Sequence, residues 1–331
     1  MAQRVRFGVL GAARITPKAL VEPARALAGE VEVYAIAARD RGRAERQAAK
    51  LGIPKVHDSY EALLADPDVE AVYNPLPNAL HAEWSIRAME AGKHVLCEKP
   101  IANNAREAEQ MAEAARRTGR ILCEAMHMRY HPVHERIPRI LESGELGAIR
   151  HAEAHACFLI ANARDIRWQY SLGGGALMDL GVYPIMNIRN MLREEPEVVS
   201  ARARVASPNV DRWIEAHLRF PSGATGRVLT SMWGWPLVEG EHFIEGAEAK
   251  LQVNDRIGLF QKLDLYKNGK RVWREKLPTT PSTYQRQLAA FVRAVRTGAP
   301  TLTGPEHFIP NMRVVDAIYR AAGLPVRGAA A

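Results

Sequence analysis

Apolar runs that alternate with amphipathic stretches dominate the first 125 residues. Strands that alternate with helices of about 10–15 residues indicate βαβ units on a parallel sheet. The expected strands cover residues 5–10, 31–38, 69–77 and 120–126 with one more before Lys99, and the expected helices cover about 16–28, 41–52, 81–92 and 104–118. We therefore expect a doubly wound Rossmann domain that binds a dinucleotide over residues 1–125.

After residue 126 the pattern changes to runs in which apolar and polar positions alternate. In the run 213–220, Ile214, Ala216, Leu218 and Phe220 fall on one face. Alternation with a period of two predicts a mostly antiparallel sheet with one face against a core. Two helices, around 284–297 and 311–322, close the chain. We expect an α+β domain for substrate binding and oligomerisation over residues 126–331, built on an open antiparallel sheet.

Composition and charge narrow the class of protein. Of the 331 residues, 47% are hydrophobic and 25% charged, which is ordinary for a globular chain. Neither a membrane-spanning run nor the apolar core of a signal peptide is expected. Three widely spaced cysteines, Cys97, Cys123 and Cys157, disfavour a disulfide framework and fit a reducing cytoplasm. The net charge of +8 is scattered, which favours attraction of a phosphorylated cofactor over nucleic-acid binding.

The segment GVLGAARITP (8–17) follows the first strand and opens a helix. A dinucleotide site needs a tight turn here, so that backbone N–H groups meet the pyrophosphate. The positions of the usual glycine pattern are Gly11, Ala13 and Thr16, so only the first is glycine. Taken alone, the segment fits an ordinary strand-to-helix turn as well, but its place at the start of a βαβ unit favours cofactor binding.

The second strand ends in Ala38-Arg39-Asp40. An NAD site usually has a carboxylate at this strand end, and Ala38 cannot supply one. Arg39 can pair with a 2′-phosphate, while Asp40 can cap the next helix. We therefore expect NADP rather than NAD as the preferred cofactor; a solvated Arg39 or an inward-turned Asp40 is the alternative.

Further candidates stand at later strand ends, where ligands bind in open α/β sheets. The loop YNPLPNALH (73–81) supplies Asn78 and His81, although His81 could equally start a helix with a satisfied imidazole. In CEKP (97–100), the proline favours an extended Lys99, whose ammonium could project from the sheet.

The segment GGGALMDLGVYP (173–184) places Asp179 and Tyr183 four positions apart after three glycines. Four positions is one helical turn, so both side chains fall on one helix face. Glycines let the backbone pass close to a ligand. The alternative is a loop with a helix cap and a packed tyrosine.

Histidines at 127, 131, 134, 151 and 155 raise the question of a metal. Neither C-x-x-C nor H-E-x-x-H spacing accompanies them, and Pro132 interrupts a shared helical face. We expect no metal site.

In their order and spacing these segments resemble the glucose–fructose oxidoreductase, inositol dehydrogenase and dihydrodiol dehydrogenase (Gfo/Idh/MocA) family. The resemblance runs almost end to end and rests on GVLGAARI, AARD, YNPLPNALH, AGKHVLCEKP, EAMHMRYHP, GGGALMDLGVYP and a Tyr-x-x-Gln segment at 284–287. It looks closest to the branch with Tyr where inositol dehydrogenases have His, because Tyr183 stands at that position. Ala13 departs from the family's glycine pattern.

The resemblance implies roles for individual residues. Lys99 would polarise the reacting oxygen, Tyr183 would exchange the proton, and Asp179 would hold the substrate. The Lys99 ammonium would favour the Tyr183 phenolate, which makes the pair a proton-transfer unit. The implied cofactor-binding residues are Gly11, Ala12, Ala13, Arg14, Ile15, Ala38, Arg39, Leu76, Asn78, His81, Glu98, Lys99, Arg129, Arg167, Trp168 and Tyr284. Besides Lys99, Asp179 and Tyr183, the expected substrate-pocket residues are His127, Phe158, Asn162 and Asp165.

The expected function is NADP-dependent interconversion of alcohol and carbonyl on a sugar or related polyol. Two alternatives stay open: an NAD-dependent glycosidase that works by redox-assisted elimination, and a cofactor-binding regulator without catalysis. Retention of Lys99, Asp179 and Tyr183 argues against the regulator. We also expect a homodimer or homotetramer through the second sheet, because Trp213 and Trp233 alternate with Ile214 and Met232, giving the sheet two apolar faces.

Overall fold

The structure, a computed structural model, describes residues 4–254 and 262–328. The chain forms two compact units, one of residues 1–127 and 281–309 and the other of residues 128–280 and 310–331. The expected boundary near residue 125 lies close to the first passage between them. The expected second domain, 126–331, is not continuous in space, because residues 281–309 belong to the first unit.

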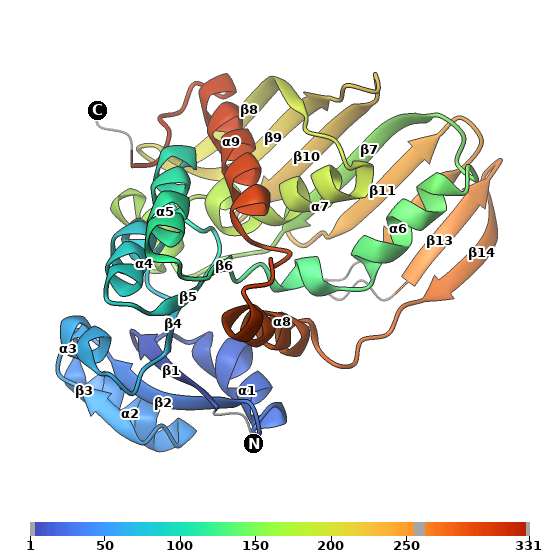
Figure 1. The fold of residues 1–331 in the computed structure, drawn as a ribbon. Coiled ribbons are helices and arrows are strands. Elements are labelled where there is room, and N and C mark those ends of the chain that lie inside the picture. Colours follow the sequence, from blue (N-terminus) through green and yellow to red (C-terminus); the bar gives the residue numbers. More distant parts are fainter. Residues whose placement is uncertain (1–3, 255–261, 329–331) are drawn as a thin grey trace. The chain divides into compact units, whose positions relative to one another are not determined.

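The first unit is built on a six-stranded sheet in the order β3-β2-β1-β4-β5-β6 (Figure 1). All neighbouring strands are parallel, as the alternation of elements predicted. The strands are β1 (Val5–Leu10), β2 (Val31–Ala37), β3 (Lys55–His57), β4 (Ala71–Asn74), β5 (His94–Cys97) and β6 (Leu122–Glu124). The strand order reverses between β1 and β4, where a doubly wound sheet forms its ligand crevice.

The helices of this unit begin and end at residues that the sequence marks for those roles. Asp40 accepts a hydrogen bond from the backbone N–H of Arg43 and caps α2, while Gly52 ends that helix in the left-handed conformation. Asn104 and Gly119 do the same for α5. The helical elements are η1 (Pro17–Val21), α1 (Glu22–Ala26), α2 (Arg41–Leu51), α3 (Tyr60–Ala65), η2 (Asn78–Leu80), α4 (His81–Glu90), α5 (Ala105–Thr118), α8 (Thr283–Thr297) and the first turn of α9 (Pro305–Ala321).

Helix α8 completes the core of the first unit. The ring of Phe291 lies 5.6 Å from the ring of Phe7 on β1, centroid to centroid. Leu288 and Val292 are buried in the same apolar cluster as Leu20. Burial of these side chains against the first sheet is the reason why residues 281–309 join this unit.

The second unit is built on an eight-stranded sheet in the order β14-β13-β12-β11-β7-β10-β9-β8. Only the β7–β10 pair among these is parallel, which agrees with a mostly antiparallel sheet. The strands are β7 (Ile149–Cys157), β8 (Glu197–Ser207), β9 (Val210–Arg219), β10 (Thr225–Ser231), β11 (Glu241–Gly246), β12 (Lys250–Asn254), β13 (Lys262–Lys267) and β14 (Lys270–Lys276). The helical elements are η3 (His127–Tyr130), α6 (Val133–Glu142), η4 (Ile166–Trp168), η5 (Tyr170–Leu172), η6 (Leu177–Gly181), α7 (Val182–Leu192) and the rest of α9.

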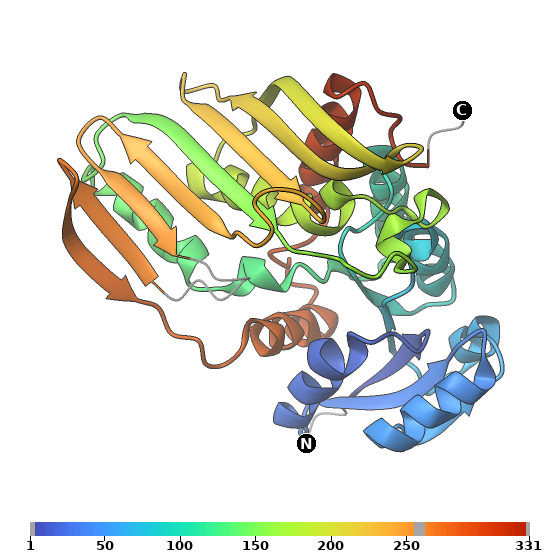
Figure 2. The same cartoon turned by 180° about the vertical axis from the view of Figure 1, so that it is seen from behind.

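The two faces of this sheet differ in chemistry. Helices α6 and α7 cover one face, and Figure 2, seen from behind, shows the other face without a helix of this unit over it. Ile214, Ala216 and Leu218 are buried on the helix side of β9, and Phe220 just after it is buried too, as the alternation predicted. The opposite side, which we call the open face, carries charged side chains, so the expectation of two apolar faces for this sheet was wrong.

Ion pairs link neighbouring strands across the open face. Arg202 of β8 donates to Glu215 of β9 at 2.6 Å. Arg227 of β10 donates to Glu215 at 3.0 Å and to Glu153 of β7 at 2.5 Å. Positive and negative side chains thus alternate from β8 to β7.

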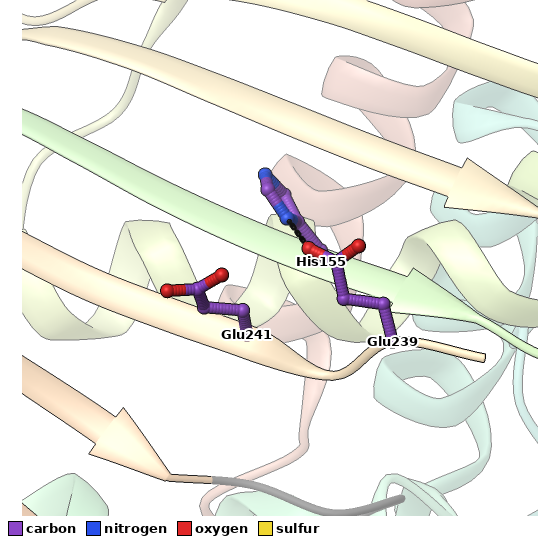
Figure 3. Close-up of side chains that lie close together, drawn as sticks. All are labelled: His155, Glu239 and Glu241. Atoms are coloured by element: carbon purple, nitrogen blue, oxygen red, sulfur yellow. Dashed lines mark hydrogen bonds and ion pairs between the residues drawn. The ribbon is translucent and has the colours of Figure 1, made fainter. Parts of the chain in front are cut away.

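His155 extends this series toward β11 (Figure 3). Its Nδ1 lies 2.6 Å from a carboxylate oxygen of Glu239, and its Nε2 lies 2.9 Å from Glu153. Glu241 brings a third group to within 4.8 Å of the His155 and Glu239 atoms, close enough for a shared metal ion. Burial would lower the pKa of His155, but hydrogen bonds to Glu153 and Glu239 outweigh it and raise that pKa. The contacts of the imidazole with the two carboxylates account for the arrangement without a metal, and the expectation of no metal stays a prediction.

The three cysteines are buried. Cys97, Cys123 and Cys157 are thiols that form no disulfide, and burial raises the pKa of Cys157 to about 12. Among the helices of residues 4–254 and 262–328, none has the length and apolar character needed to cross a bilayer.

We predict that His155 makes the stability of the protein depend on pH. Its folded-state pKa is raised above the value of about 6.5 for an unfolded chain, so its contribution is present at low pH and is lost as the pH rises through the folded-state pKa. In urea denaturation, His155→Gln should therefore lose more free energy of unfolding at about pH 6 than at about pH 9. His217→Gln, at a half-exposed side chain of β9, is the control. An equal loss at both pH values for His155→Gln would contradict the prediction.

Candidate active site

Gly11 forms the tight turn after β1. Its φ of +88° lies in the left-handed region, and a Cβ there would stand 3.0 Å from Cδ2 of Leu76. Its N–H donates to the carbonyl of Ala37 at 2.7 Å. A side chain at this position would both strain the backbone and fill the space beside Leu76, so the turn gives a close approach to the backbone of residues 11–15.

Helix α2 holds the same turn in place. Arg43 donates to the carbonyl of Ala12 at 3.2 Å, and Gln47 donates to the carbonyl of Ala13 at 2.9 Å. The sequence interpretation missed both residues. Their spacing of four, on one face of the helix after the second strand, was the available signal.

The end of β2 presents arginine rather than a carboxylate. Ala38 is buried, Arg39 is exposed, and the Asp40 carboxylate accepts the Arg43 N–H at 3.0 Å as a helix cap. Burial raises the pKa of the Tyr60 phenol, and the charges of Arg39 and Arg43 oppose that shift. The charges of Arg39 and Arg43 therefore lie close enough to Tyr60 to oppose the rise of its pKa. The Tyr60 hydroxyl lies 3.9 Å from a Cβ built on Gly11.

The ends of β4 and β5 are joined through His81. Its ring is fully buried, with Nε2 2.7 Å from the carbonyl of Leu76 and Nδ1 2.8 Å from the carbonyl of Pro100. Burial lowers the pKa of His81 to about 4, although the two carbonyls oppose that shift. The neutral ring has one N–H, so it donates to one of the two carbonyls and faces the other. Its nitrogens are used by the backbone, and His81 positions these loops. Asn78 lies half-buried in the short helix η2.

Glu98 and Lys99 follow β5. The Tyr73 hydroxyl donates to Glu98 at 2.7 Å, and the second carboxylate oxygen of Glu98 accepts the Lys99 N–H at 3.3 Å. These bonds fix the backbone of Lys99, whose side chain is half-buried.

Two predicted site residues from distant parts of the sequence meet in the first unit. The rings of His127 and Tyr284 stack with their centroids 3.9 Å apart, and Nδ1 of His127 lies 2.8 Å from Thr283 Oγ1. The Lys18 ammonium lies 5.7 Å from the centre of the Tyr284 ring. Burial and the charges of Lys99 and Lys18 lower the pKa of His127 to about 3. His127 is therefore a neutral polar group.

In the second unit, Asp179 and Tyr183 lie on one continuous helical segment. Asp179 belongs to the π-helical turn η6 and Tyr183 to the first turn of α7. The sequence predicted an ordinary first turn of a helix for both. A π-turn is wider, and such turns are frequent at functional sites.

Arg167 pairs with two of the predicted carboxylates. Its Nε donates to Asp179 at 2.6 Å, and its Nη1 donates to Asp165 at 3.0 Å. Burial would lower the pKa of Arg167, but the charges and hydrogen bonds of Asp179 and Asp165 raise it. Arg167, which was expected among the cofactor-binding residues, thus pairs with two of the predicted substrate residues.

The remaining predicted residues fall in loops and short turns. Trp168 ends η4, Arg129 lies in η3, and Phe158 and Asn162 are exposed after β7. In the cofactor turn, Arg14 is exposed, while Ala12, Ala13 and Ile15 are half-buried. Lys99 belongs to the first unit, and Asp179 and Tyr183 belong to the second.

Comparison with known proteins covers both units. Residues 5–126 match the model of the oxidoreductase family with an NAD-binding Rossmann fold (GFO_IDH_MocA), and residues 134–251 match the GFO/IDH/MocA C-terminal domain. The D-xylose 1-dehydrogenase (NADP(+)) 2 of Haloferax volcanii is 36% identical over 321 residues, which cover 96% of this chain and 97% of that protein. The trans-1,2-dihydrobenzene-1,2-diol dehydrogenase of Mus musculus is 32% identical over 269 residues, with coverage of 81% and 79%.

Among solved structures, the 3-ketoreductase KijD10 of Actinomadura kijaniata, in complex with NADP and TDP-benzene, is similar with a TM-score of 0.88. The two chains are 31% identical, with 96% of this chain and 98% of the other covered. These relatives span nearly the whole chain, and the family models follow one another in the order that the sequence predicted. The chain therefore belongs to the GFO/IDH/MocA family of oxidoreductases, with an NAD-binding Rossmann domain followed by the family's C-terminal domain.

Proposed function

We propose that this protein is an NADP-dependent oxidoreductase that interconverts an alcohol and a carbonyl on a sugar or related polyol. The observation that carries the proposal is the combination of Lys99 at the end of β5 with Asp179 and Tyr183 on the segment that begins α7. The relatives support the substrate class, since they include a D-xylose dehydrogenase and a 3-ketoreductase.

The relatives also support the choice of residues. Solved structures of the ketoreductase include variants in which one lysine is replaced by Ala or Glu, and a variant in which one tyrosine is replaced by Phe. That lysine and tyrosine are the same number of positions apart as Lys99 and Tyr183 are here. The proposal places this chain in the branch with Tyr in place of His.

The residues at the strand ends fit a bound dinucleotide. Gly11 leaves open the space that a Cβ would fill, so the N–H groups of residues 12–15 can meet a pyrophosphate. Arg39 is an exposed guanidinium at the end of β2, suited to a 2′-phosphate. When bound, NADP would supply or accept the hydride.

The protein's own groups would then handle the oxygen and its proton. The Lys99 ammonium would stabilise negative charge on the reacting oxygen. The Tyr183 phenol would exchange the proton with that oxygen. Asp179, held by Arg167, would orient the substrate hydroxyls, and His127 would offer a neutral polar group beside Tyr284.

A substrate panel tests the proposal directly. Aldoses, ketoses, polyols and simple glycosides, with D-xylose among them, are incubated with NADP+, NADPH or NAD+, and both absorbance of the reduced cofactor and release of free sugar are followed. Net formation or consumption of reduced cofactor supports the proposal. Sugar release without net change in reduced cofactor would indicate the redox-assisted glycosidase, and binding without any turnover would indicate a regulator.

We predict that Tyr183→Phe and Lys99→Ala each lower kcat by about 10²–10⁴-fold, because each removes a positioned proton-transfer group. NADP affinity should change little. The loss of kcat in the double variant should be far smaller than the product of the two single losses, because the residues act as a unit. Tyr34→Phe removes a hydroxyl bonded to Asp68 on the surface and serves as the control. Normal turnover in Tyr183→Phe would end this mechanism.

The cofactor preference provides a second prediction. Charge-assisted hydrogen bonds from Arg39 to a 2′-phosphate contribute about 1.5–3 kcal/mol, or roughly a 10- to 150-fold preference for NADP. Arg39→Ala should remove most of it by weakening NADP alone, and Ala38→Asp should shift the preference further toward NAD. Arg41→Ala, which loses surface ion pairs with Glu45 and Asp58, is the control. Equal affinities in the wild type that stay equal in Arg39→Ala would show that Arg39 is a bystander.

The protein is also predicted to associate with further copies through the second sheet. Phe158 and Leu159 after β7 are exposed, as are Trp233 and Trp235 after β10, and backbone hydrogen bonds pair these two segments. Large exposed apolar patches mark interfaces. Light scattering should give a multiple of 36.7 kDa, and Trp235→Asp should shift the mass toward the monomer. A 36.7 kDa particle for the wild type at micromolar concentration would refute this.

A further inference from the structure

A fully buried ion pair joins the C-terminal segment of the second unit to the start of β9. Arg327 and Asp211 both have 0% of their surface exposed, and their nearest charged atoms lie 2.8 Å apart. The Tyr319 hydroxyl of α9 donates to the same carboxylate oxygen at 2.9 Å. Burial raises the pKa of Tyr319 well above its usual range, so the phenol keeps the proton that it donates. We call these three residues the buried clamp.

Further hydrogen bonds connect the clamp to the glycine-rich loop and to the turn that follows it. The second oxygen of Asp211 accepts the N–H of Leu177 at 2.7 Å, and Nε of Arg327 donates to the carbonyl of Gly174 at 2.9 Å. The Arg327 guanidinium also lies 4.8 Å from the ring centre of Tyr170, just before this loop. The clamp therefore holds both sides of Gly175.

The space between the backbone of Gly175 and the clamp is too small for a side chain. The φ of Gly175 is +142°, and a Cβ would collide with the Asp211 carboxylate and stand 2.9 Å from both Arg327 and Tyr319. Its N–H donates to the carbonyl of Arg167, and its carbonyl accepts the N–H of Asp179, each at 3.0 Å. One glycine thus connects the clamp to Arg167, the partner of Asp179, and to Asp179 itself.

We propose that Asp211, Tyr319 and Arg327 are positioning residues for the reaction. They set the start of the helical segment that carries Asp179 and Tyr183, and they set the Arg167 backbone opposite it. None of the three acts on the substrate in this scheme. The role rests on the proposed function, since it matters for turnover only if Asp179 and Tyr183 act there.

Three variants test the clamp in the full-length protein. Tyr319→Phe removes one hydroxyl and keeps the ring, Arg327→Lys keeps the charge and loses the forked geometry, and Arg320→Ala is an exposed control on the same helix. With the best substrate of the panel, kcat should fall about 10- to 100-fold in Tyr319→Phe and Arg327→Lys, as expected for small misplacements. NADPH affinity by fluorescence titration and the cooperative unfolding transition should remain, and Arg320→Ala should match the wild type.

A double variant separates positioning from general loss of structure. If the clamp acts through Tyr183 and Asp179, adding Tyr319→Phe to Tyr183→Phe should cost less than twofold more, because the positioned group is already lost. Multiplication of the two losses would overturn the proposal. So would wild-type kcat in folded Tyr319→Phe and Arg327→Lys.

Hydrogen exchange makes the test independent of any substrate. Amide exchange of residues 174–183 should rise in Tyr319→Phe, while exchange of β12 stays as in the wild type. Unchanged exchange at 174–183, or an equal rise in β12, would overturn the clamp. If no sugar of the panel turns over, or if Tyr183→Phe is fully active, the proposed function fails while this exchange result still decides the clamp.

Discussion

Backbone groups in the loops near the candidate site lack sheet or helix partners, and this constraint shapes the parts around them. A buried carbonyl or N–H without a partner costs free energy comparable to a lost hydrogen bond. In this chain, side chains from other elements supply the partners. His81 faces two carbonyls at the ends of β4 and β5, Arg43 bonds the turn after β1, and Asp211 bonds the segment that begins α7. These side-chain hydrogen bonds can thus hold a loop in one conformation although the loop has no helix or sheet hydrogen bonds.

The two sheets meet this constraint in different ways. In the parallel sheet the carboxyl ends of all strands lie at the same edge, so a single buried ring can contact the loops that follow two neighbouring strands. In the second unit, the glycine-rich loop runs beside β9 and α9, and partners come from an ion pair with no exposed surface. Such a pair is costly to desolvate, and here its carboxylate and guanidinium also hydrogen-bond loop backbone.

Much of the fold could be predicted from the sequence because periodicity reports burial. The period-two pattern of β9 and the alternation of strands and helices before residue 125 gave the right sheets. The turn at Gly11 could also be found, because its chemistry is local. The alternative for His81, a helix start with a satisfied imidazole, is confirmed. Its carbonyl partners and the stacking of His127 with Tyr284 could not be predicted, because each depends on which loops the topology brings together. Arg327 could not be assigned either, since an arginine near a chain end gives no sign that it is buried.

The position of α8 in the sequence affects how the protein is made. Phe7 lies on β1, but its ring partner Phe291 comes from helix α8, which is made long after β1. At synthesis rates of about 5–20 residues per second, an apolar face of the first sheet waits for many seconds without its cover. Until α8 is made, the first unit exposes this apolar face, and a fragment of residues 1–127 would lack part of its own core.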